Sequence, residues 1–536
     1  MQERTYLFRH ALMQEVAYQL QPPSQRSELH GRIVRLMEKL FAGQLEEHAI
    51  ALADHASRAH EGENRNEVTS GLRNKEVRYL QVAAGVAQKR YDNGLAIGLL
   101  RRLAGLPWTP PTVRFSSLES IAQLQLGMAQ ASQATQTIQQ LLELARHGAQ
   151  PAEESRALLL LAKLASLQGR HADSLAYGQQ AEYQAAGTKD PALQMHLHSE
   201  LGVICHRRGE TGQSLAHFEK GLKLARELGQ RSEMVSVLNR CGAVHLLQGR
   251  LDEAELLLNE SAVLARELDD QKNLAAVLAN LGVLSRRRNQ LEKALALYDE
   301  SIALSLRVGL RESLMNSTDN RGVVLNLLGR TDEAQQAHDE ARQIARELGD
   351  KRREAASVLN MALVQRKTGK LEAADQMLSE SLALCREAGD VRGQVNALTN
   401  RGLLRIRQKE APFEALHDFI YAEALASGMG SHTEVYLLKA RQLECLVSLK
   451  LYEDVVAYGE SMLKEPAIRQ HHTDALMAIY FNQGFAREAL GQAEAARQDI
   501  LQFIQLAEAR GTLGAGELED LESARALLGR LTTRSE

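Results

Sequence analysis

Asparagine side chains recur at one phase of this sequence, two residues before a recurring glycine or alanine. The set comprises Asn280, Asn320, Asn360, Asn400 and Asn482. One period earlier the same place holds Arg240, with Asn239 beside it. Because asparagine is a mediocre helix former and its carboxamide both donates and accepts hydrogen bonds, we expect a ladder that holds the backbone of an extended peptide. The alternative is that each asparagine bonds a neighbouring repeat and only fixes the stacking.

Basic side chains follow one to two turns later in the same segments. They are Arg286, Arg287 and Arg288, then Arg366 and Lys367, then Arg405 and Arg407, with His206 and Arg207 at the matching place earlier. A stripe that faced a partner would bind acidic or carboxylate-bearing segments, since guanidinium groups pair bidentately with carboxylates. Three successive arginines span too wide an arc to face one surface together. The alternative is a solvated helix end, where cations are favourable near the C-terminus.

No residue pattern points to catalysis, a cofactor or a metal. The histidines His48, His55 and His60 are spaced by seven and five residues, which places only the first two on one helical face. The sequence lacks His-Glu-x-x-His, the nucleophile elbow Gly-x-Ser-x-Gly and the phosphate-binding Gly-x-x-x-x-Gly-Lys-Ser/Thr. We therefore expect a protein without enzymatic activity, cofactor or metal.

The composition narrows the partner and the compartment. The chain has 64 basic and 68 acidic residues and a net charge of −4, so it lacks the basic excess typical of nucleic-acid binding. No apolar run approaches the roughly 18 residues of a membrane helix. The four cysteines form no Cys-x-x-Cys pair and occupy core-like phases; they are Cys205, Cys241, Cys385 and Cys445. We expect a reducing, cytoplasmic compartment and a protein or peptide partner, with no nucleic acid and no membrane.

Helices are the elements that must position these side chains. None of the nine prolines lies between residues 192 and 411, and good helix formers dominate the composition. A glycine recurs at a constant spacing, with one alanine in the series: Gly202, Gly242, Gly282, Gly322, Ala362, Gly402. A second set lies seven residues after each of the positions from Gly202 to Ala362: Gly209, Gly249, Asn289, Gly329, Gly369. Each member of this series follows the previous one by the same number of residues as separates Gly202 from Gly242. This constant period predicts a repeat protein.

Each repeat has the pattern of a helical hairpin. In the repeat from Gln230, apolar residues from Val237 to Leu246 follow helical spacing, and Gly249 separates the two helices. Gly242 is small where the two helices cross, and Gly229 ends the second helix in a left-handed conformation. Because one hairpin cannot bury its own apolar face, neighbouring hairpins must stack.

The glycine, glycine and alanine pattern resembles the tetratricopeptide repeat (TPR), with the longer period of kinesin-light-chain-like members. The resemblance implies an all-α fold, a right-handed superhelical solenoid of hairpins whose first helices line a concave groove. We expect about nine to ten repeats over residues 115–516 and a capping helix with a frayed tail over 517–536. The family's aromatic positions are mostly leucine or alanine here.

Residues 1–70 do not follow this frame. Arg9-His-Ala-Leu12 and the residues up to Tyr18, then the motifs at 29–34, 52–55 and 75–103, resemble the junction between ATPase module and TPR array in bacterial STAND-type signalling ATPases. The resemblance implies a helical region at 1–70, and a TPR-like hairpin with a rigid Pro-rich linker at 71–114. It also implies that this chain is the C-terminal regulatory half of a larger protein, or a truncated relative.

Two functions are consistent with these patterns. The first is a scaffold that binds a peptide or partner segment in the concave TPR groove, with an acidic segment among the candidates. The second is a sensor of a small molecule or signalling peptide that controls an attached kinase, cyclase or DNA-binding domain. The chain's own upstream ATPase or output domain is then a further partner.

Overall fold

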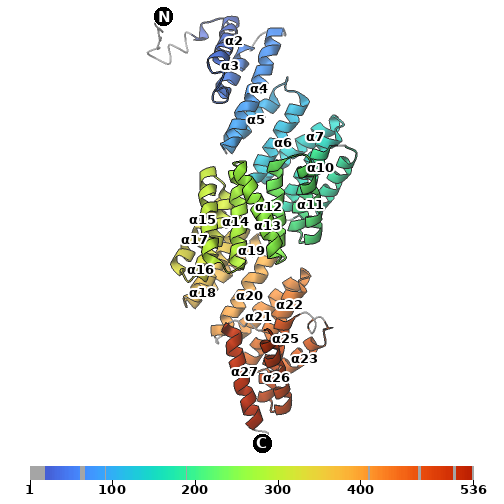
Figure 1. The fold of residues 1–536 in the computed structure, drawn as a ribbon, viewed down its shortest axis with the longest axis vertical. Coiled ribbons are helices and arrows are strands. Elements are labelled where there is room, and N and C mark those ends of the chain that lie inside the picture. The colour runs from blue at the N-terminus through green and yellow to red at the C-terminus, as the bar shows by residue number, and fades with distance from the viewer. Residues whose placement is uncertain are drawn as a thin grey trace. The chain divides into compact units, whose positions relative to one another are not determined.

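The computed structural model describes residues 18–60, 67–90, 92–128, 130–168, 170–188, 190–408, 411–466, 468, 472–510 and 515–533. These residues form 25 α-helices and no strand, which confirms the all-α prediction (Figure 1). The motif from Arg9 to Ala17 lies outside the described residues, as do the side chains of Arg207 and Arg407.

Ten consecutive helix pairs, in which we call the first helix A and the second helix B, span residues 111–510. The A helices are α6 (Pro111–Gly127), α8 (Pro151–Leu167), α10 (Pro191–Arg207), α12 (Arg231–Leu247), α14 (Gln271–Arg287), α16 (Arg311–Leu327), α18 (Lys351–Lys367), α20 (Val391–Gln408), α22 (His432–Ser448) and α25 (Thr473–Ala489). The B helices are α7 (Ala131–His147), α9 (His171–Ala186), α11 (Thr211–Glu227), α13 (Leu251–Glu267), α15 (Leu291–Val308), α17 (Thr331–Leu348), α19 (Leu371–Glu387), α21 (Pro412–Gly428), α23 (Tyr452–Leu463) and α26 (Ala493–Arg510).

The remaining helices lie at the two ends of the chain. They are α2 (Pro23–Leu40), α3 (Ala49–Ala59), α4 (Glu67–Lys89), α5 (Asn93–Gly105) and α27 (Ala515–Thr533). By their contacts the residues divide into two compact units, one of residues 1–287 and 303–310 and one of residues 288–302 and 311–536. None of the described helices is long and apolar enough to cross a membrane.

In the five hairpins from α10 to α19 the turn contains a left-handed residue, as the second set of glycines predicted. Gly209, Gly249, Gly329 and Gly369 have φ between +74° and +81°. Asn289 takes the same conformation, with φ +58°, where the series lacks a glycine. Asparagine is among the few side chains that tolerate this region, so the exception obeys the same physical rule.

The recurring glycine of helix A lets the two helices of a hairpin cross closely. A Cβ added at Gly242 would lie 2.6 Å from Cγ of Leu258, and one at Gly322 would lie 2.7 Å from the ring of His338. Both facing side chains are buried. The prediction that Gly242 is small for close packing is therefore confirmed, and its contact is Leu258 on α13.

Serine side chains connect the helices of a hairpin through the backbone. Ser261 on α13 donates to the carbonyl of Val235 on α12, and Ser381 on α19 donates to that of Ala355 on α18, each at 2.8 Å. Both serines are buried, so these bonds satisfy polar groups that water cannot reach. The small side chain and its bond help to hold helix B against helix A.

The boundaries expected near the ends of the array fall inside helices. The boundary at 70/71 lies within α4, that at 114/115 within α6, and that at 516/517 within α27. The Pro-rich segment expected as a linker packs instead against the preceding helices: the Trp108 ring lies edge-on to His60 and below the guanidinium of Arg73. One apolar cluster from Val34 to Ile121 continues across this segment, so α2 to α6 share a core.

Candidate functional site: the exposed faces of the A helices

Helices A present a repeated set of positions, which we call the A-helix face. Relative to the recurring glycine or alanine, its positions are −3, −2, +1, +4 and +5. Most of the described side chains at these positions are half-exposed or exposed, although Leu246 on α12 is buried. On α12 and α14 the face belongs to the first compact unit, and on α16, α18 and α20 to the second. On these helices the positions contain Asn239, Asn280, Asn320, Asn360 and Asn400, and most of the cations that the sequence singled out.

In the first unit the face contains a pair of carboxamides. Asn280 on α14 donates through Nδ2 to Oδ1 of Asn239 on α12 at 2.8 Å. Both side chains are half-exposed. The two side-chain amide hydrogens of Asn239 have no hydrogen-bond partner among the described residues, and neither does the side-chain oxygen of Asn280. The bond joins positions 41 residues apart, so neighbouring repeats meet one residue out of phase.

In the second unit the equivalent bond joins an amide to a carboxylate. Asn360 on α18 donates to Oδ2 of Asp319 on α16 at 2.9 Å. The other oxygen of Asp319 lies 2.8 Å from Nδ1 of His338, which is buried beneath it on α17. Both pairs match the alternative in which an asparagine bonds its neighbouring repeat, while the side chains stay partly open to a partner.

The other asparagines are not joined into the same ladder. Asn400 and Asn482 each donate to a carbonyl one turn earlier in their own helix, that of Asn396 and that of Ala478. Asn482 is also buried, which removes it from the face. Asn320 is half-exposed and makes no side-chain hydrogen bond within the described part of the chain.

Arg240 takes the place of an asparagine on α12 and is partly neutralised. Its Nη1 lies 3.4 Å from the carbonyl oxygen of Ser199 and 3.7 Å from Oε1 of Glu200, both on α10. This contact again connects one A helix to the preceding one. Arg240 therefore carries a charge that its neighbour already balances.

The cations at the ends of the A helices bond the preceding A helix. Arg287 donates from Nη1 to the carbonyl oxygen of Leu246 at 2.5 Å, and Lys367 donates to that of Asn326. Both contacts reach carbonyls in the last turn of the neighbouring helix, which also accept from the turn amides of Gly249 and Gly329. This is the helix-end alternative for the basic stripe, and it leaves each charge exposed at the surface.

The remaining predicted cations differ in how they are engaged. Arg286 is half-exposed, and among the described residues its guanidinium has no hydrogen-bond or ion-pair partner. Arg366 and His206 are also half-exposed, and each already interacts with a neighbouring group. Among the described cations of the stripe, Arg286 is therefore one whose guanidinium remains available for a carboxylate.

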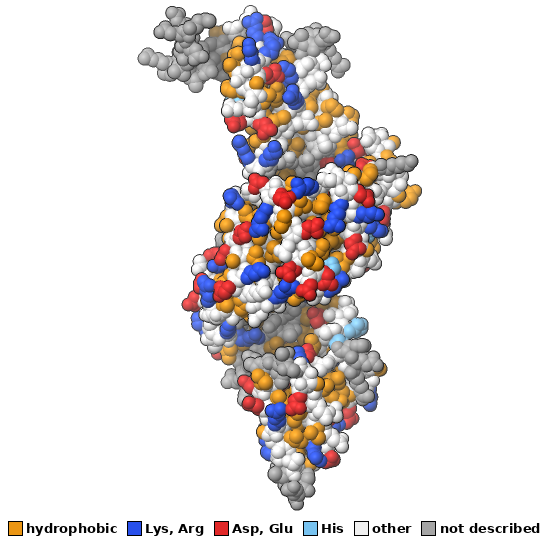
Figure 2. Space-filling view, viewed as in Figure 1, with side chains coloured by type: hydrophobic (Ala, Val, Ile, Leu, Met, Phe, Trp, Pro, Cys, Tyr) orange, Lys and Arg blue, Asp and Glu red, His pale blue; other side chains and the backbone are white. Residues whose placement is uncertain are grey.

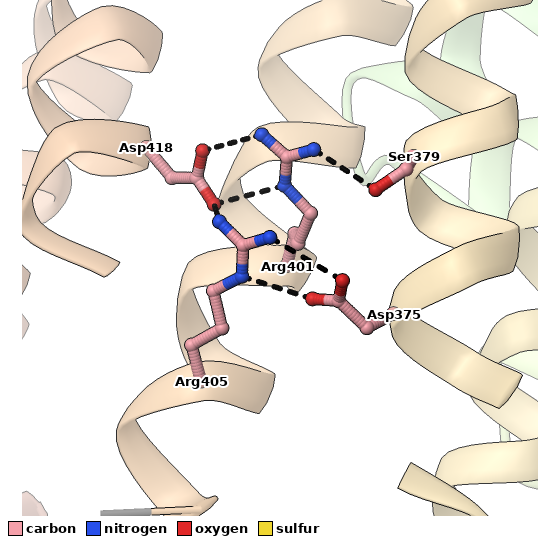
Figure 3. Close-up of polar contacts among 5 residues, drawn as sticks. All are labelled: Asp375, Ser379, Arg401, Arg405 and Asp418. Atoms are coloured by element: carbon pink, nitrogen blue, oxygen red, sulfur yellow. Dashed lines mark hydrogen bonds and ion pairs between the residues drawn. The ribbon is translucent and has the colours of Figure 1, made fainter. Parts of the chain in front are cut away.

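Arg405 belongs to a buried network and not to the exposed stripe in which the sequence placed it (Figure 3). The carboxylate of Asp418 on α21 accepts from Nε and Nη2 of Arg401 at 2.9 and 2.6 Å and from Nη1 of Arg405 at 3.0 Å. Arg405 also bonds Asp375 on α19 through Nε at 2.9 Å. The Asp418 side chain is 1% exposed, so this network connects three helices around a carboxylate that water does not reach.

The same arrangement recurs in the last repeat of the array. Arg487 on α25 bonds Asp499 on α26 at 2.6 Å and Glu460 on α23 at 2.7 Å. Arg487 and Arg405 both lie three residues after the recurring glycine, and both aspartates directly precede the side chain that packs on that glycine. Burial raises the pKa of Asp499 to about 6, although Arg487 opposes the shift.

Two exposed leucines also belong to the A-helix face. They were not identified from the sequence. Leu247 is the last residue of α12 and is 60% exposed; Leu327 is the last residue of α16 and is 54% exposed. The nearby Leu246 and Leu325 are buried. Comparison of position +5 between repeats is the signal that could have found them.

The described residues contain no arrangement suited to metal or thiol chemistry. No group of three or more His, Cys, Asp or Glu side chains could hold a metal ion in the described part. The four cysteines are buried as expected, and burial raises the pKa of Cys241 and of Cys445 to about 12. His55 pairs with His30 at 2.8 Å, while His60 bonds the buried Glu76 at 2.8 Å.

Opposite charges are interspersed on the surface of both units. On the face shown in Figure 2, Lys and Arg side chains alternate with Asp and Glu, and no broad patch of one sign is visible among the described residues. On this face the described charges therefore favour local contacts over a long-range field.

The repeats match a known family model. Residues 193–267, 233–307 and 313–387 each match the tetratricopeptide repeat. A search of curated proteins gave no match. Similar solved structures include apo NprR, a quorum sensor from B. thuringiensis, with 15% identity, a TM-score of 0.47, and coverage of 65% of this chain and 97% of that chain.

Two further structures are similar at the same level. A Rap protein complexed with competence and sporulation factor has 12% identity, a TM-score of 0.46, and coverage of 76% of this chain and 99% of that one. The Cut9–Hcn1 hetero-tetramer of the APC/C has 16% identity, a TM-score of 0.47, and coverage of 96% and 94%. The family model and the helix pairs together confirm a fold of tetratricopeptide hairpins.

Proposed function

We propose that this chain is a non-catalytic scaffold that binds an extended segment of a partner protein along its A-helix face. The observation that carries the proposal is the half-exposed pair of Asn239 and Asn280. Their mutual bond orients both carboxamides and leaves donors on one and an acceptor on the other. An extended backbone offers the matching carbonyl and amide groups.

Apolar and charged groups flank this pair on the same face. Ala243 and Val283, at position +1, are half-exposed one turn further along α12 and α14. Arg286 and Arg287 follow after another turn. A bound segment would thus meet a polar row, a small apolar row and a cationic row, which favours a partner with acidic side chains. The chemistry is recognition, since none of these groups is paired with a base or nucleophile.

The test combines binding with stability. Asn239→Ala with Asn280→Ala would remove both carboxamides, and Asn259→Ala on the exposed side of α13 serves as the matched control. Peptides selected from a random 16-residue display library on the wild-type chain provide the probes. Because each hydrogen bond contributes about 0.5–1.5 kcal/mol, binding should weaken roughly five- to hundredfold in the double variant only.

A lower melting temperature of the double variant with unchanged peptide binding would contradict the proposal. That result would assign the pair to repeat stacking alone. Failure to select any saturable peptide on the wild-type chain would contradict it as well. Circular dichroism at the temperature of the assay separates loss of fold from loss of binding.

The regulatory context is a second proposal and depends on the sequence alone. The motifs in the first 100 residues lead us to propose that the array is the sensor part of a STAND-type signalling ATPase in a cytoplasmic system. Its occupancy by a small molecule or signalling peptide would control an attached kinase, cyclase or DNA-binding domain. An in-frame phosphate-binding loop in the coding sequence upstream would support this proposal, and its absence from the gene would contradict it.

A further inference from the structure

The last residue of helix A alternates between leucine and a cation along the array. From α8 to α18 these residues are Leu167, Arg207, Leu247, Arg287, Leu327 and Lys367. The chemistry of this position thus repeats with every second hairpin, at twice the structural period. An exposed leucine needs no explanation by itself, but a regular alternation with cations at one phase does.

In the first unit Leu247 and Arg287 form one such pair. The guanidinium of Arg287 bonds the carbonyl oxygen of Leu246, the residue next to Leu247, at 2.5 Å. This bond fixes a positive charge at the backbone of the residue that precedes Leu247, whose side chain is 60% exposed. Arg286, without a hydrogen-bond or ion-pair partner among the described residues, precedes Arg287 on the same helix. An aliphatic surface and cationic donors therefore lie together.

In the second unit Leu327 and Lys367 repeat this arrangement. The ammonium of Lys367 bonds the carbonyl oxygen of Asn326, the residue next to Leu327. Leu327 is 54% exposed, close to the value for Leu247. The carboxylate of Asp319 lies eight residues earlier on the helix, about 12 Å away along the axis, and already accepts from Asn360 and contacts His338.

We propose that the chain has two equivalent binding sites, Leu247 with Arg287 and Leu327 with Lys367. Each binds one aliphatic side chain of the partner, with a neighbouring carboxylate on the cation. The inference rests on the proposed function and specifies its partner: a segment, bound in one copy at each site, in which a large aliphatic residue lies within two positions of Asp or Glu. Contact between the leucine of each site and the partner's aliphatic side chain removes apolar surface from water. The pair of cation and carboxylate sets the orientation of the bound segment.

The third leucine of the series, Leu167, lies in a different setting. Between α8 and α10 the A-helix face has Glu200 where the later repeats have asparagine, and Leu160 holds the same place one repeat earlier. Glu200 is already paired with Arg240, and Leu160 is buried, so this level lacks the half-exposed carboxamide that Asn280 and Asn360 provide at the other two. The same partner chemistry therefore predicts two sites per chain and not three.

An exposed leucine outside the face offers a matched control. Leu256 on α13 is 73% exposed, and the exposed residues within one turn of it are Asp252, Glu253, Asn259 and Glu260. These neighbours are acidic or neutral and not basic. Leu256→Ser therefore removes the same amount of side chain on a B helix, outside the A-helix face, where the nearby cation Arg226 is already paired with Glu260.

The experiment uses the full chain and peptides selected from a random 16-residue display library. We expect the selected peptides to carry Leu, Ile, Val or Met within two positions of Asp or Glu. Isothermal titration of a synthetic selected peptide should give two molecules per chain. Leu247→Ser with Arg287→Ser should leave one, as should Leu327→Ser with Lys367→Ser, and the combined variant should lose binding by at least about tenfold at each site. Leu256→Ser should change neither the number of peptides bound per chain nor their affinity.

Separate outcomes identify which proposal fails. Peptides that bind, depend on Asn239 and Asn280, but ignore both leucine–cation pairs would overturn this inference and leave the proposed function intact. Selected peptides without an aliphatic–acidic pair would do the same. If no peptide binds the wild-type chain, the proposed function fails and this inference with it. Since the substituted leucines are exposed, unchanged circular dichroism spectra are expected throughout.

Discussion

Substitution of Gly242 by valine tests the packing on which the repeat geometry depends. The added Cβ alone would lie 2.6 Å from Cγ and 2.7 Å from Cδ2 of Leu258, closer than carbon atoms approach in proteins. Leu258 is fully buried, so it cannot move into solvent. Overpacking of this kind costs about 1–3 kcal/mol, and two further methyl groups place valine at the upper end. Valine regains only about 0.4 kcal/mol of helix propensity over glycine.

The expected net loss is therefore about 2–3 kcal/mol in the free energy of unfolding. Urea denaturation followed by far-ultraviolet circular dichroism gives the measurement, as a shift of the midpoint of the first unit. Gly212 provides the matched control, because it is a helical glycine of α11 in the same unit with no heavy atom within 4 Å of an added Cβ. Equal midpoints for Gly242→Val and Gly212→Val would refute the reasoning, since close helix crossing would then not limit the repeat.

Three further predictions concern turns and buried charges. Asn289 has φ +58°, so Asn289→Ala should destabilise by about 1 kcal/mol and Asn289→Gly should not, as measured by thermal melting. Arg401→Met removes two of the three hydrogen bonds to the buried carboxylate of Asp418, so a loss of about 3 kcal/mol in urea unfolding is expected; a loss below about 1 kcal/mol would contradict the network. Because burial raises the pKa of Asp499 to about 6, the folded chain binds its proton more readily than the unfolded chain, and stability should fall as pH rises from about 4 to 6; Asp499→Asn should remove that part of the pH dependence.

Much of the repeat could be predicted from single positions because each has a local physical requirement. A glycine or asparagine at the hairpin turn is needed for a left-handed conformation, so Gly249 and Asn289 mark the same turn. A glycine at the crossing is needed because a side chain would meet Leu258 or His338. Such requirements act within one hairpin, and their recurrence at a constant period makes them a clear signal.

The candidate site was only partly predictable, because its contacts join different repeats. The sequence places Asn280 and Asn360 at one phase, but their partners Asn239 and Asp319 lie at the phase one residue earlier. That offset comes from the stacking of one A helix on the next. Nor does a leucine at a helix end show whether it is buried: Leu246 is 3% exposed and Leu247 is 60% exposed.

The sequence by itself determined the helical hairpins, their period and the residue types on the A-helix face, because local conformation and close packing within a hairpin act over short distances along the chain. Tertiary structure decided which of those residues stay available. Arg405 enters a buried network with Asp375 and Asp418, while Arg287 stays at the surface. The difference arises from carboxylates on adjacent helices, which only stacking brings within hydrogen-bond distance.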